Sequence, residues 1–109
     1  MEKRLRGIDL IAEERRRQIE DMGFDTVHDT ILWNDGQLTK AAVCYAKNTL
    51  PKGDSNDVVP KDWPWADKWW KPSSDIRDLV KAGALIAAQI DVYLTKNGNV
   101  PSENESATK

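Results

Sequence analysis

The spacing of apolar and polar positions predicts three helices along the chain. Across residues 3–22, 36–48 and 74–96, apolar side chains recur three or four positions apart, as in helices that bury one face. The positions expected to be buried are Ile8, Ile11, Ala12, Ile19 and Met22 in the first helix, Leu38, Ala41, Ala42, Tyr45 and Thr49 in the second, and Ile76, Leu79, Val80, Gly83, Ile86, Ala87, Ile90 and Leu94 in the third.

The last predicted helix also carries a weaker apolar stripe on its opposite side, formed by Leu85, Ala88 and Val92. A helix that is apolar on two sides lies at the centre of a bundle or contacts a partner subunit. The sequence leaves both alternatives open.

Residues that start or stop helices set the connections. Gly23 is a C-cap glycine and Asp35 a good N-cap, so we expect an ordered loop over residues 24–35. Residues 50–73 form a long connection with a short helical turn around 65–70. The predicted fold is therefore all-α: a small helical bundle of three to four helices with a long Trp-rich connecting loop.

Length and charge narrow the class of protein. A chain of 109 residues fits one domain, which we place at residues 1–98, with a disordered polar tail at 99–109. The formal net charge of −2 argues against general nucleic-acid binding, because phosphate contacts need a basic excess. We see no signal peptide and no apolar run of about 18 residues, so we expect a cytoplasmic protein without a membrane partner.

One charged residue stands among the apolar positions of the first helix. Arg15 projects onto the centre of the apolar stripe, with Gln18 beside it, whereas Arg16 and Arg17 project outward. A buried guanidinium needs a carboxylate or another acceptor. The partner of Arg15 is therefore either an internal Asp or Glu, or an anionic ligand.

Four of the five tryptophans lie within eight residues, as Trp63, Trp65, Trp69 and Trp70. Indoles bury large areas and stack on flat rings, so the cluster is either a lid that seals the core or an aromatic wall for a nucleobase or a partner. Positive charge from Lys71, Arg77 and Lys81 would suit a phosphate, although ordinary surface charge explains it equally well.

Acidic residues supply candidates for metal binding and catalysis. Glu14, Asp29 and Asp78 are the candidate Mg²⁺ ligands, because carboxylate oxygens are what this ion prefers. Glu14, His28 and Asp29 are the candidate catalytic residues; a lone histidine beside an aspartate is also a common structural pair. Asp75 and Asp78 are explained equally well by the helix dipole, and Cys44 is typical of a small buried apolar residue.

These segments together resemble a small protein family of tailed phages and prophages. The residues that carry the resemblance are Glu14-Arg15-Arg16-Arg17-Gln18, His28-Asp29, Gly36 through Tyr45, Trp63-Pro64-Trp65, Trp69-Trp70-Lys71-Pro72, and Arg77 through Ile86. The resemblance covers roughly residues 8–94, and such proteins are often labelled MazG-like.

The MazG group implies a helical bundle that forms a dimer or tetramer. It also implies Mg²⁺ held by a Glu-x-x-Glu motif and a Glu-x-x-Asp motif, and hydrolysis of a nucleotide to its monophosphate and pyrophosphate. This chain has no Glu-x-x-Glu, and its nearest acidic pair on the last helix is Asp75-x-x-Asp78.

Three hypotheses therefore stay open. The first is a Mg²⁺-dependent nucleotide pyrophosphohydrolase of MazG type. The second is a non-catalytic binder that sequesters a nucleotide or nucleotide-derived signal, in which tryptophans stack on the base while Arg15, Lys71, Arg77 or Lys81 meets phosphate. The third is a module that binds a host protein through the Trp-rich segment. A phage-encoded protein would act in the host cytosol.

Overall fold

The computed structural model describes residues 5–33, 35–51 and 58–98. These contain four α-helices and no strand: α1 (Gly7–Met22), α2 (Thr26–Leu32), α3 (Gln37–Lys47) and α4 (Asp75–Lys96), with a short 3-10 helix, η1 (Asp67–Trp69). The predicted all-α bundle is confirmed, as is the helical turn in the long connection. The proposed tail at 99–109 lies outside the described residues.

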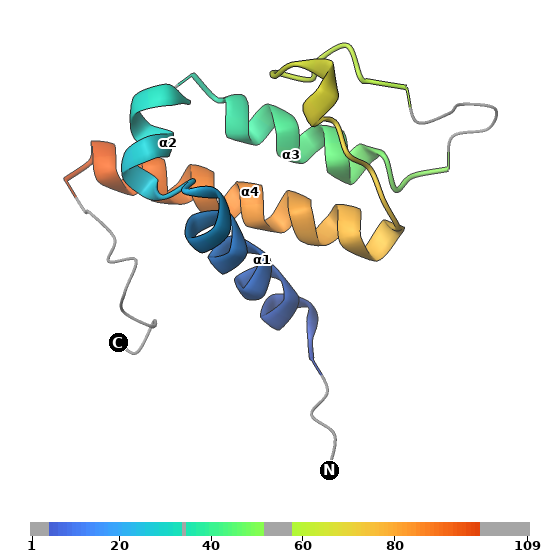
Figure 1. Ribbon diagram of the computed structural model, residues 1–109, viewed down its shortest axis with the longest axis horizontal. Coiled ribbons are helices and arrows are strands. Elements are labelled where there is room, and N and C mark those ends of the chain that lie inside the picture. The colour runs from blue at the N-terminus through green and yellow to red at the C-terminus, as the bar shows by residue number, and fades with distance from the viewer. Residues whose placement is uncertain (1–4, 34, 52–57, 99–109) are drawn as a thin grey trace.

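Helix α4 is the element against which the other three helices pack. In Figure 1, α3 runs beside α4 in the opposite direction, and α1 crosses α4 at a steep angle. The Trp-rich segment lies over α3 and leads back into the start of α4.

The core forms where α3 meets α4 and is closed by two indoles. Small residues on both helices, Ala41 and Ala42 on α3 and Ala88 on α4, let the backbones approach closely. The larger buried apolar side chains in this core are Leu38, Tyr45, Leu85, Val92, Trp63 and Trp70. Cys44 is buried here too, as expected, and burial raises the pKa of its thiol.

Two helix ends show the expected capping chemistry, and a third is an exception. The Ser74 side chain accepts a hydrogen bond from the N–H of Arg77 and begins α4. Gly23, with φ +72°, ends α1 in the left-handed conformation that favours glycine. The exception is α3, whose N-cap is Gly36 at φ +84° and not Asp35.

The prediction of a loop over residues 24–35 is wrong, because Thr26–Leu32 forms α2. Its β-branched residues have modest helix propensity, which favoured a loop. Asp25 caps its N-terminus: the Asp25 side chain accepts a hydrogen bond from the N–H of His28 (2.9 Å). Buried Thr26 and Asp29 then fix it against the rest of the molecule. Tertiary contacts therefore outweigh propensity here.

The predicted buried face of α1 is also wrong in part. Ile8 is 68% exposed, and Ala12 and Met22 are exposed as well. The residues that α1 buries are polar: Glu14, Arg15 and Gln18. The face that α1 turns inward is therefore defined by its polar contacts more than by its apolar stripe.

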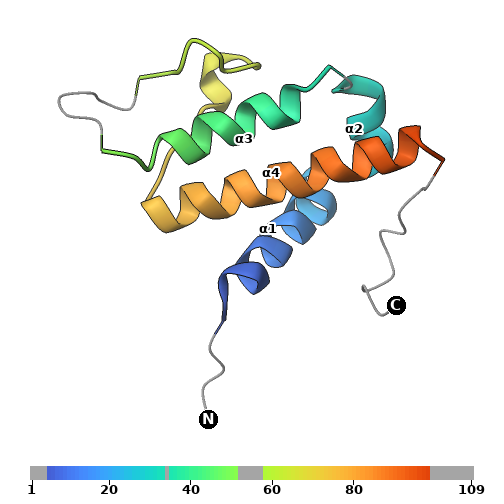
Figure 2. The ribbon, with the colours of Figure 1, turned by 180° about the vertical axis from the view of Figure 1, so that it is seen from behind.

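In α4 the two apolar faces are largely exchanged relative to the prediction, although Val80 of the expected face is buried. The weaker stripe of Leu85, Ala88 and Val92 is buried against α3, whereas much of the stronger stripe is exposed, with Ile76 at 66%. Figure 2 shows α4 in front on this side of the molecule, and Ile11 of α1 covers the face only at Gly83. The exposed apolar residues of this side are Ile76, Leu79, Ile86, Ile90, Tyr93 and Leu94.

Candidate functional site

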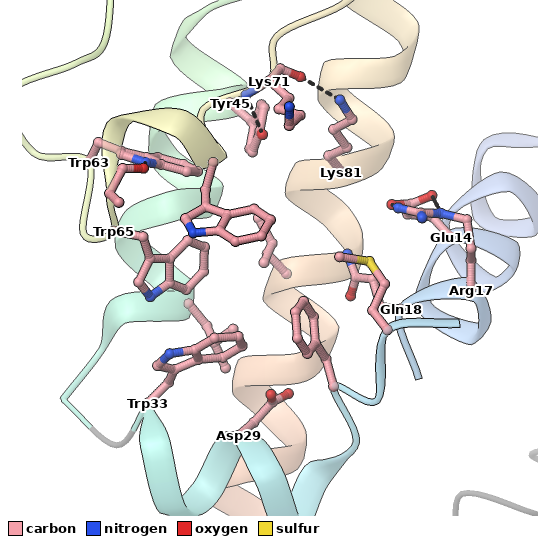
Figure 3. A pocket seen from close by; sticks show the side chains of 16 residues that line it. Glu14, Arg17, Gln18, Asp29, Trp33, Tyr45, Trp63, Trp65, Lys71 and Lys81 are labelled. Atoms are coloured by element: carbon pink, nitrogen blue, oxygen red, sulfur yellow. Dashed lines mark hydrogen bonds and ion pairs between the residues drawn. The ribbon is translucent and has the colours of Figure 1, made fainter. Parts of the chain in front are cut away.

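A cavity of about 570 Å³ lies between α1, α3, α4 and the Trp-rich segment. We call it the aromatic cavity, because six aromatic side chains line it: Phe24, Trp33, Tyr45, Trp63, Trp65 and Trp69. Figure 3 shows Trp33, Trp63 and Trp65 along one side of this space, with Glu14 and Arg17 across it. Its charged and polar lining residues are Glu14, Arg17, Gln18, Asp29, Lys71 and Lys81.

Three indoles of the cavity, those of Trp33, Trp63 and Trp65, belong to one continuous set of ring contacts. Trp65 joins Trp33 (ring centroids 4.7 Å apart) to Trp63 (5.3 Å), and Trp63 meets Trp70 and Tyr45 (5.0 and 5.5 Å). The Trp63 indole N–H donates to the carbonyl of Ala66 (3.1 Å), which fixes the turn that leads into η1. The wall is thus built on the core and held in place.

The sequence left two interpretations of the tryptophans, a lid over the core or an aromatic wall. In the structure each interpretation describes some of the four. Trp70 is buried in the core and stacks on Tyr45 with ring centroids 4.8 Å apart, as a lid residue would. Trp65 and half-exposed Trp69 line the cavity, as wall residues would. Trp63 does both.

Two lysines and a tyrosine form one end of the aromatic cavity (Figure 3). The Tyr45 hydroxyl accepts a hydrogen bond from the N–H of Lys71 (3.2 Å), and Lys81 Nζ donates to the Lys71 carbonyl (2.6 Å). Lys81 Nζ also lies 5.3 Å from the centre of the Tyr45 ring. Burial lowers the pKa of Lys81, so an anion placed beside it would favour its charged form.

Glu14 is a buried carboxylate held by two arginines. Arg17 donates to both its oxygens, from Nε to Oε1 (3.0 Å) and from Nη2 to Oε2 (2.7 Å). Arg77 of α4 donates from Nη2 to Oε1 (2.9 Å), which ties α1 to α4. Burial acts to raise the pKa of Glu14, but the hydrogen bonds from Arg17 and Arg77 outweigh burial and leave it lowered.

Asp29 stands at the other end of the cavity, opposite the lysines in Figure 3. It is fully buried, and its Oδ1 lies 3.1 Å from Nδ1 of His28. Its Oδ2 lies 3.5 Å from Nη2 of Arg15 and has no hydrogen bond. Burial raises the pKa of Asp29 and outweighs the opposing effects of His28 and Arg15.

Arg15 is buried, as the helical wheel indicated, and its partners are internal. Nη1 donates to the carbonyl of Phe24 (2.9 Å), and Nη2 lies near Asp29 (3.5 Å) and Asp91 (3.8 Å). The first of the two alternatives for this residue therefore describes the structure. Arg15 joins α1 to α2 and α4 and does not line the cavity.

Asp78 also has a structural position. It is fully buried, accepts hydrogen bonds from Nδ2 of Asn48 (3.0 Å) and from the N–H of Ser73 (2.8 Å), and does not line the cavity. It fastens the start of α4 to the end of α3.

The cavity therefore collects some of the predicted site residues and not others. Seven line it: Glu14, Asp29, Trp63, Trp65, Trp69, Lys71 and Lys81. Five lie outside its lining: Arg15, His28, Trp70, Arg77 and Asp78. His28 packs behind it, stacked on Phe24 at 5.1 Å and edge-on to Trp33 at 4.8 Å.

Sequence reasoning missed several lining residues, among them Arg17, Gln18, Phe24, Trp33 and Tyr45. Arg17 was expected to point outward, but it turns back to Glu14 three positions earlier on α1. That spacing of opposite charges on a helix is the one signal that could have found it. Gln18 was noted only as the neighbour of Arg15, and nothing in the sequence places Trp33 beside Trp65.

The predicted Mg²⁺ ligands do not fit that ion. Within the described residues, no three His, Cys, Asp or Glu side chains gather where they could hold a metal. Glu14 is bound by two arginines, Asp29 by Arg15 and His28, and Asp78 by Asn48 and a backbone N–H. These carboxylates already have partners, so no step of a mechanism is assigned to a metal.

The fold and this site together define a small all-α protein with an aromatic cavity that is cationic at one end. None of the helices in the described part of the chain is both long and apolar enough to cross a bilayer. No protein-family model, curated protein or solved structure matches the chain.

Proposed function

We propose that the protein binds a nucleotide or a nucleotide-derived small molecule in the aromatic cavity. The observation that carries this proposal is the pairing of an aromatic wall with a cationic end in one concave site. The volume of about 570 Å³ lies within the range of roughly 300–1,000 Å³ that is usual for small-molecule pockets.

The aromatic wall suits a nucleobase. Indoles stack on flat rings whatever the base, and Trp65 stands between Trp33 and Trp63 in a fixed array. Leu38 and Leu85 add apolar lining, which favours a ligand that leaves water.

The end of the cavity that Lys71, Lys81 and Tyr45 form suits a phosphate. Arg17, Lys71 and Lys81 line the cavity, and Arg77 adds a fourth cation at Glu14. Two carboxylates, those of Glu14 and Asp78, lie close enough to Lys81 to favour its charged form. The four cations therefore outnumber the carboxylates near them. A positively charged, partly desolvated recess of this kind attracts anions.

This proposal is one of binding, and it favours the non-catalytic alternative. The carboxylates that a Mg²⁺-dependent pyrophosphohydrolase would need are paired with cations and hydrogen-bond donors. The resemblance to the phage and MazG-like proteins stays a prediction, and so does a role in sequestering a nucleotide signal.

We also propose that two copies associate through the outer side of α4. Ile76, Leu79, Gly83, Ile86, Ile90 and Tyr93 follow one another at alternating spacings of three and four residues, which is the seam pattern of paired helices. Except for Gly83, whose Cα faces Ile11 of α1, these side chains are exposed. Large exposed apolar faces of this kind mark interaction sites.

The binding proposal is tested with the purified chain and a panel of nucleoside 5′-mono-, di- and triphosphates. We expect tryptophan fluorescence quenching and a raised melting temperature, weaker in high salt because phosphate contacts are screened. Trp65→Leu and Lys81→Met should each weaken binding at least about tenfold, since a stacked base contributes about 1–3 kcal/mol. Val43→Ala, at an exposed position of α3 outside both the cavity lining and the α4 seam, is the control. No quenching or melting shift with any nucleotide contradicts the proposal.

A further inference from the structure

Two arginines, Arg17 and Arg77, meet at one carboxylate oxygen; we call them the arginine pair. Both donate to Oε1 of Glu14, from Arg17 Nε at 3.0 Å and from Arg77 Nη2 at 2.9 Å. The Glu14 side chain is only 3% exposed, whereas those of Arg17 and Arg77 are 47% and 43% exposed. The buried carboxylate therefore holds two guanidinium groups side by side, each with much of its side chain open to a ligand.

The arginine pair keeps hydrogen-bond donors that Glu14 does not use. Glu14 accepts two hydrogen bonds from Arg17 and one from Arg77, and a guanidinium carries more N–H groups than that. Within the described part of the chain, the remaining N–H groups of both guanidiniums have no acceptor. Because the guanidinium fork matches the oxygens of a phosphate, the pair can bind a phosphoryl group without releasing Glu14.

The arginine pair lies close to Lys81, so the two cationic positions are neighbours. Burial is the largest cause of the lowered pKa of Lys81, and the charges of Arg77 and Arg17 lower it further, while Asp78 and Glu14 act in the opposite sense. Figure 3 shows Lys81 between the upper end of the cavity and the Glu14–Arg17 ion pair. An anion that bridges Lys81 and the arginine pair would relieve the repulsion among these three cations.

We propose that Lys81 and the arginine pair bind two linked phosphoryl groups directly, so that the cavity prefers nucleotides with a 5′-diphosphate or a longer chain to monophosphates. The base stacks on the indoles, the first phosphoryl group meets Lys81, and the second meets Arg17 and Arg77. We expect Mg²⁺ to weaken the complex, because it neutralises the charge that the arginines would meet. This inference rests on the proposed nucleotide binding and names the class of nucleotide that the same site prefers.

The experiment compares adenosine 5′-monophosphate, adenosine 5′-diphosphate and adenosine 3′,5′-bisphosphate by titration calorimetry on the intact chain with a chelator present. The bisphosphate carries no less charge than the diphosphate, but its phosphoryl groups are not linked to each other. The diphosphate should bind roughly tenfold tighter than the monophosphate, since hydrogen bonds to charged groups are the stronger kind. The bisphosphate should stay within about threefold of the monophosphate. Excess Mg²⁺ should weaken binding of the diphosphate.

Arg17→Met removes one member of the arginine pair, while Glu14 keeps its hydrogen bond from Arg77. The readout is the ratio of the dissociation constants for monophosphate and diphosphate within one variant, which is insensitive to a modest loss of stability. That ratio should fall from roughly ten to about three or less, and Arg77→Met should act in the same direction. Arg16→Met is the matched control, because it removes the same charge from an exposed neighbouring position of α1 that does not line the cavity. It should keep the original ratio.

Several outcomes overturn the inference and leave nucleotide binding intact. Equal affinity for monophosphate and diphosphate shows that no second phosphoryl group is bound, and equal affinity for bisphosphate and diphosphate shows that only charge counts. Tighter binding of the diphosphate with Mg²⁺ shows that the arginine pair does not meet it directly. The same ratio in Arg16→Met and Arg17→Met shows that Arg17 has no specific part. If no nucleotide binds the unmodified protein, the proposed function fails and this inference fails with it.

Discussion

At the scale of single residues, the Gln18 side chain lines the aromatic cavity, and no described residue provides its amide with a hydrogen bond. Replacing Gln18 with methionine removes this amide and keeps an apolar chain of similar length. We expect the free energy of unfolding of the free protein to change by less than about 0.5 kcal/mol, because an amide that water can reach through the cavity is not penalised by folding. Urea unfolding followed by circular dichroism measures this change.

Gln89 supplies a matched control in the same protein. It is buried, and its Oε1 accepts hydrogen bonds from the N–H (3.1 Å) and hydroxyl (2.9 Å) of Thr39, although its Nε2 has no hydrogen bond. Gln89→Met leaves those donors unbonded, and we expect a loss of about 1–2 kcal/mol. If both variants lose stability to the same extent, the Gln18 amide makes a hydrogen bond in solution that the structure does not contain.

A second residue-scale prediction concerns Glu14 and pH. The pKa of Glu14 is lowered in the folded protein, so its stabilising effect is complete above its unfolded pKa of about 4.5 and is lost as the pH falls through the folded value. Glu14→Gln should lose about 1–2 kcal/mol at pH 7, since hydrogen bonds to charged groups are the stronger kind.

The difference in unfolding free energy between the original protein and Glu14→Gln should then shrink as the pH is lowered from about 6 to about 3. Asp29, with its raised pKa, acts in the opposite sense, but it is present in both proteins and cancels in the comparison. A difference that stays constant over this range means that Glu14 does not interact with Arg17 and Arg77 as the structure indicates.

Single residues also show where sequence reasoning reaches its limit. The burial of Arg15 could be predicted, because a helical wheel places it among apolar neighbours. The place of Gln18 in the cavity lining could not, since a wheel gives the direction of a side chain and not what lies opposite it. Trp33 joins Trp65 only through the fold, at a separation of 32 positions.

At the scale of elements, Arg15 is the residue that holds α1, α2 and α4 together. Its guanidinium meets Asp29 of α2, Asp91 of α4 and the carbonyl of Phe24. Arg15→Met leaves Asp29 charged and buried, so we expect a loss of about 3 kcal/mol in unfolding free energy.

A double-mutant cycle with Asp29→Asn measures the coupling between these helices. Because the asparagine side chain carries no charge that needs Arg15, the double variant should recover about 2 kcal/mol relative to the sum of the single changes. Purely additive losses would mean that the 3.5 Å approach of Arg15 to Asp29 does not join α1 to α2.

Helices as elements could largely be predicted, whereas their inward faces could not. The bounds of α3 and α4 differ from the sequence estimate by at most one residue at each end. Yet α4 buries the stripe of Leu85, Ala88 and Val92 and exposes Ile86 and Ile90. The exposed stripe is the more apolar of the two. Close packing on the small residues of α3 decides which face turns inward, and periodicity alone does not contain that information.

At the scale of the whole molecule, the exposed apolar face of α4 and the aromatic cavity lie on opposite sides of this helix. Lys81 and Leu85 line the cavity, whereas Leu79, Ile86 and Ile90 are exposed. A second copy seated on this side would therefore cover apolar surface and leave the cavity open.

The proposed association predicts a dimer at micromolar concentration and its loss in Ile90→Lys. A lysine in the seam would place a charge against apolar side chains of the partner. Removing water from that charge makes association less favourable by several times RT. Sedimentation equilibrium at about 10–100 µM measures the mass, and circular dichroism checks that the helices remain.

Ile31→Lys on α2 is the control, because Ile31 is as exposed as the seam residues but lies on another element. We expect it to remain dimeric, and Ile90→Lys to be monomeric and still able to bind nucleotide. A monomer in the unmodified protein at about 100 µM, or equal effects of both lysines, contradicts the seam. Nucleotide binding that disappears together with the dimer would instead mean that the cavity is completed by the second copy, because Ile90 itself does not line it.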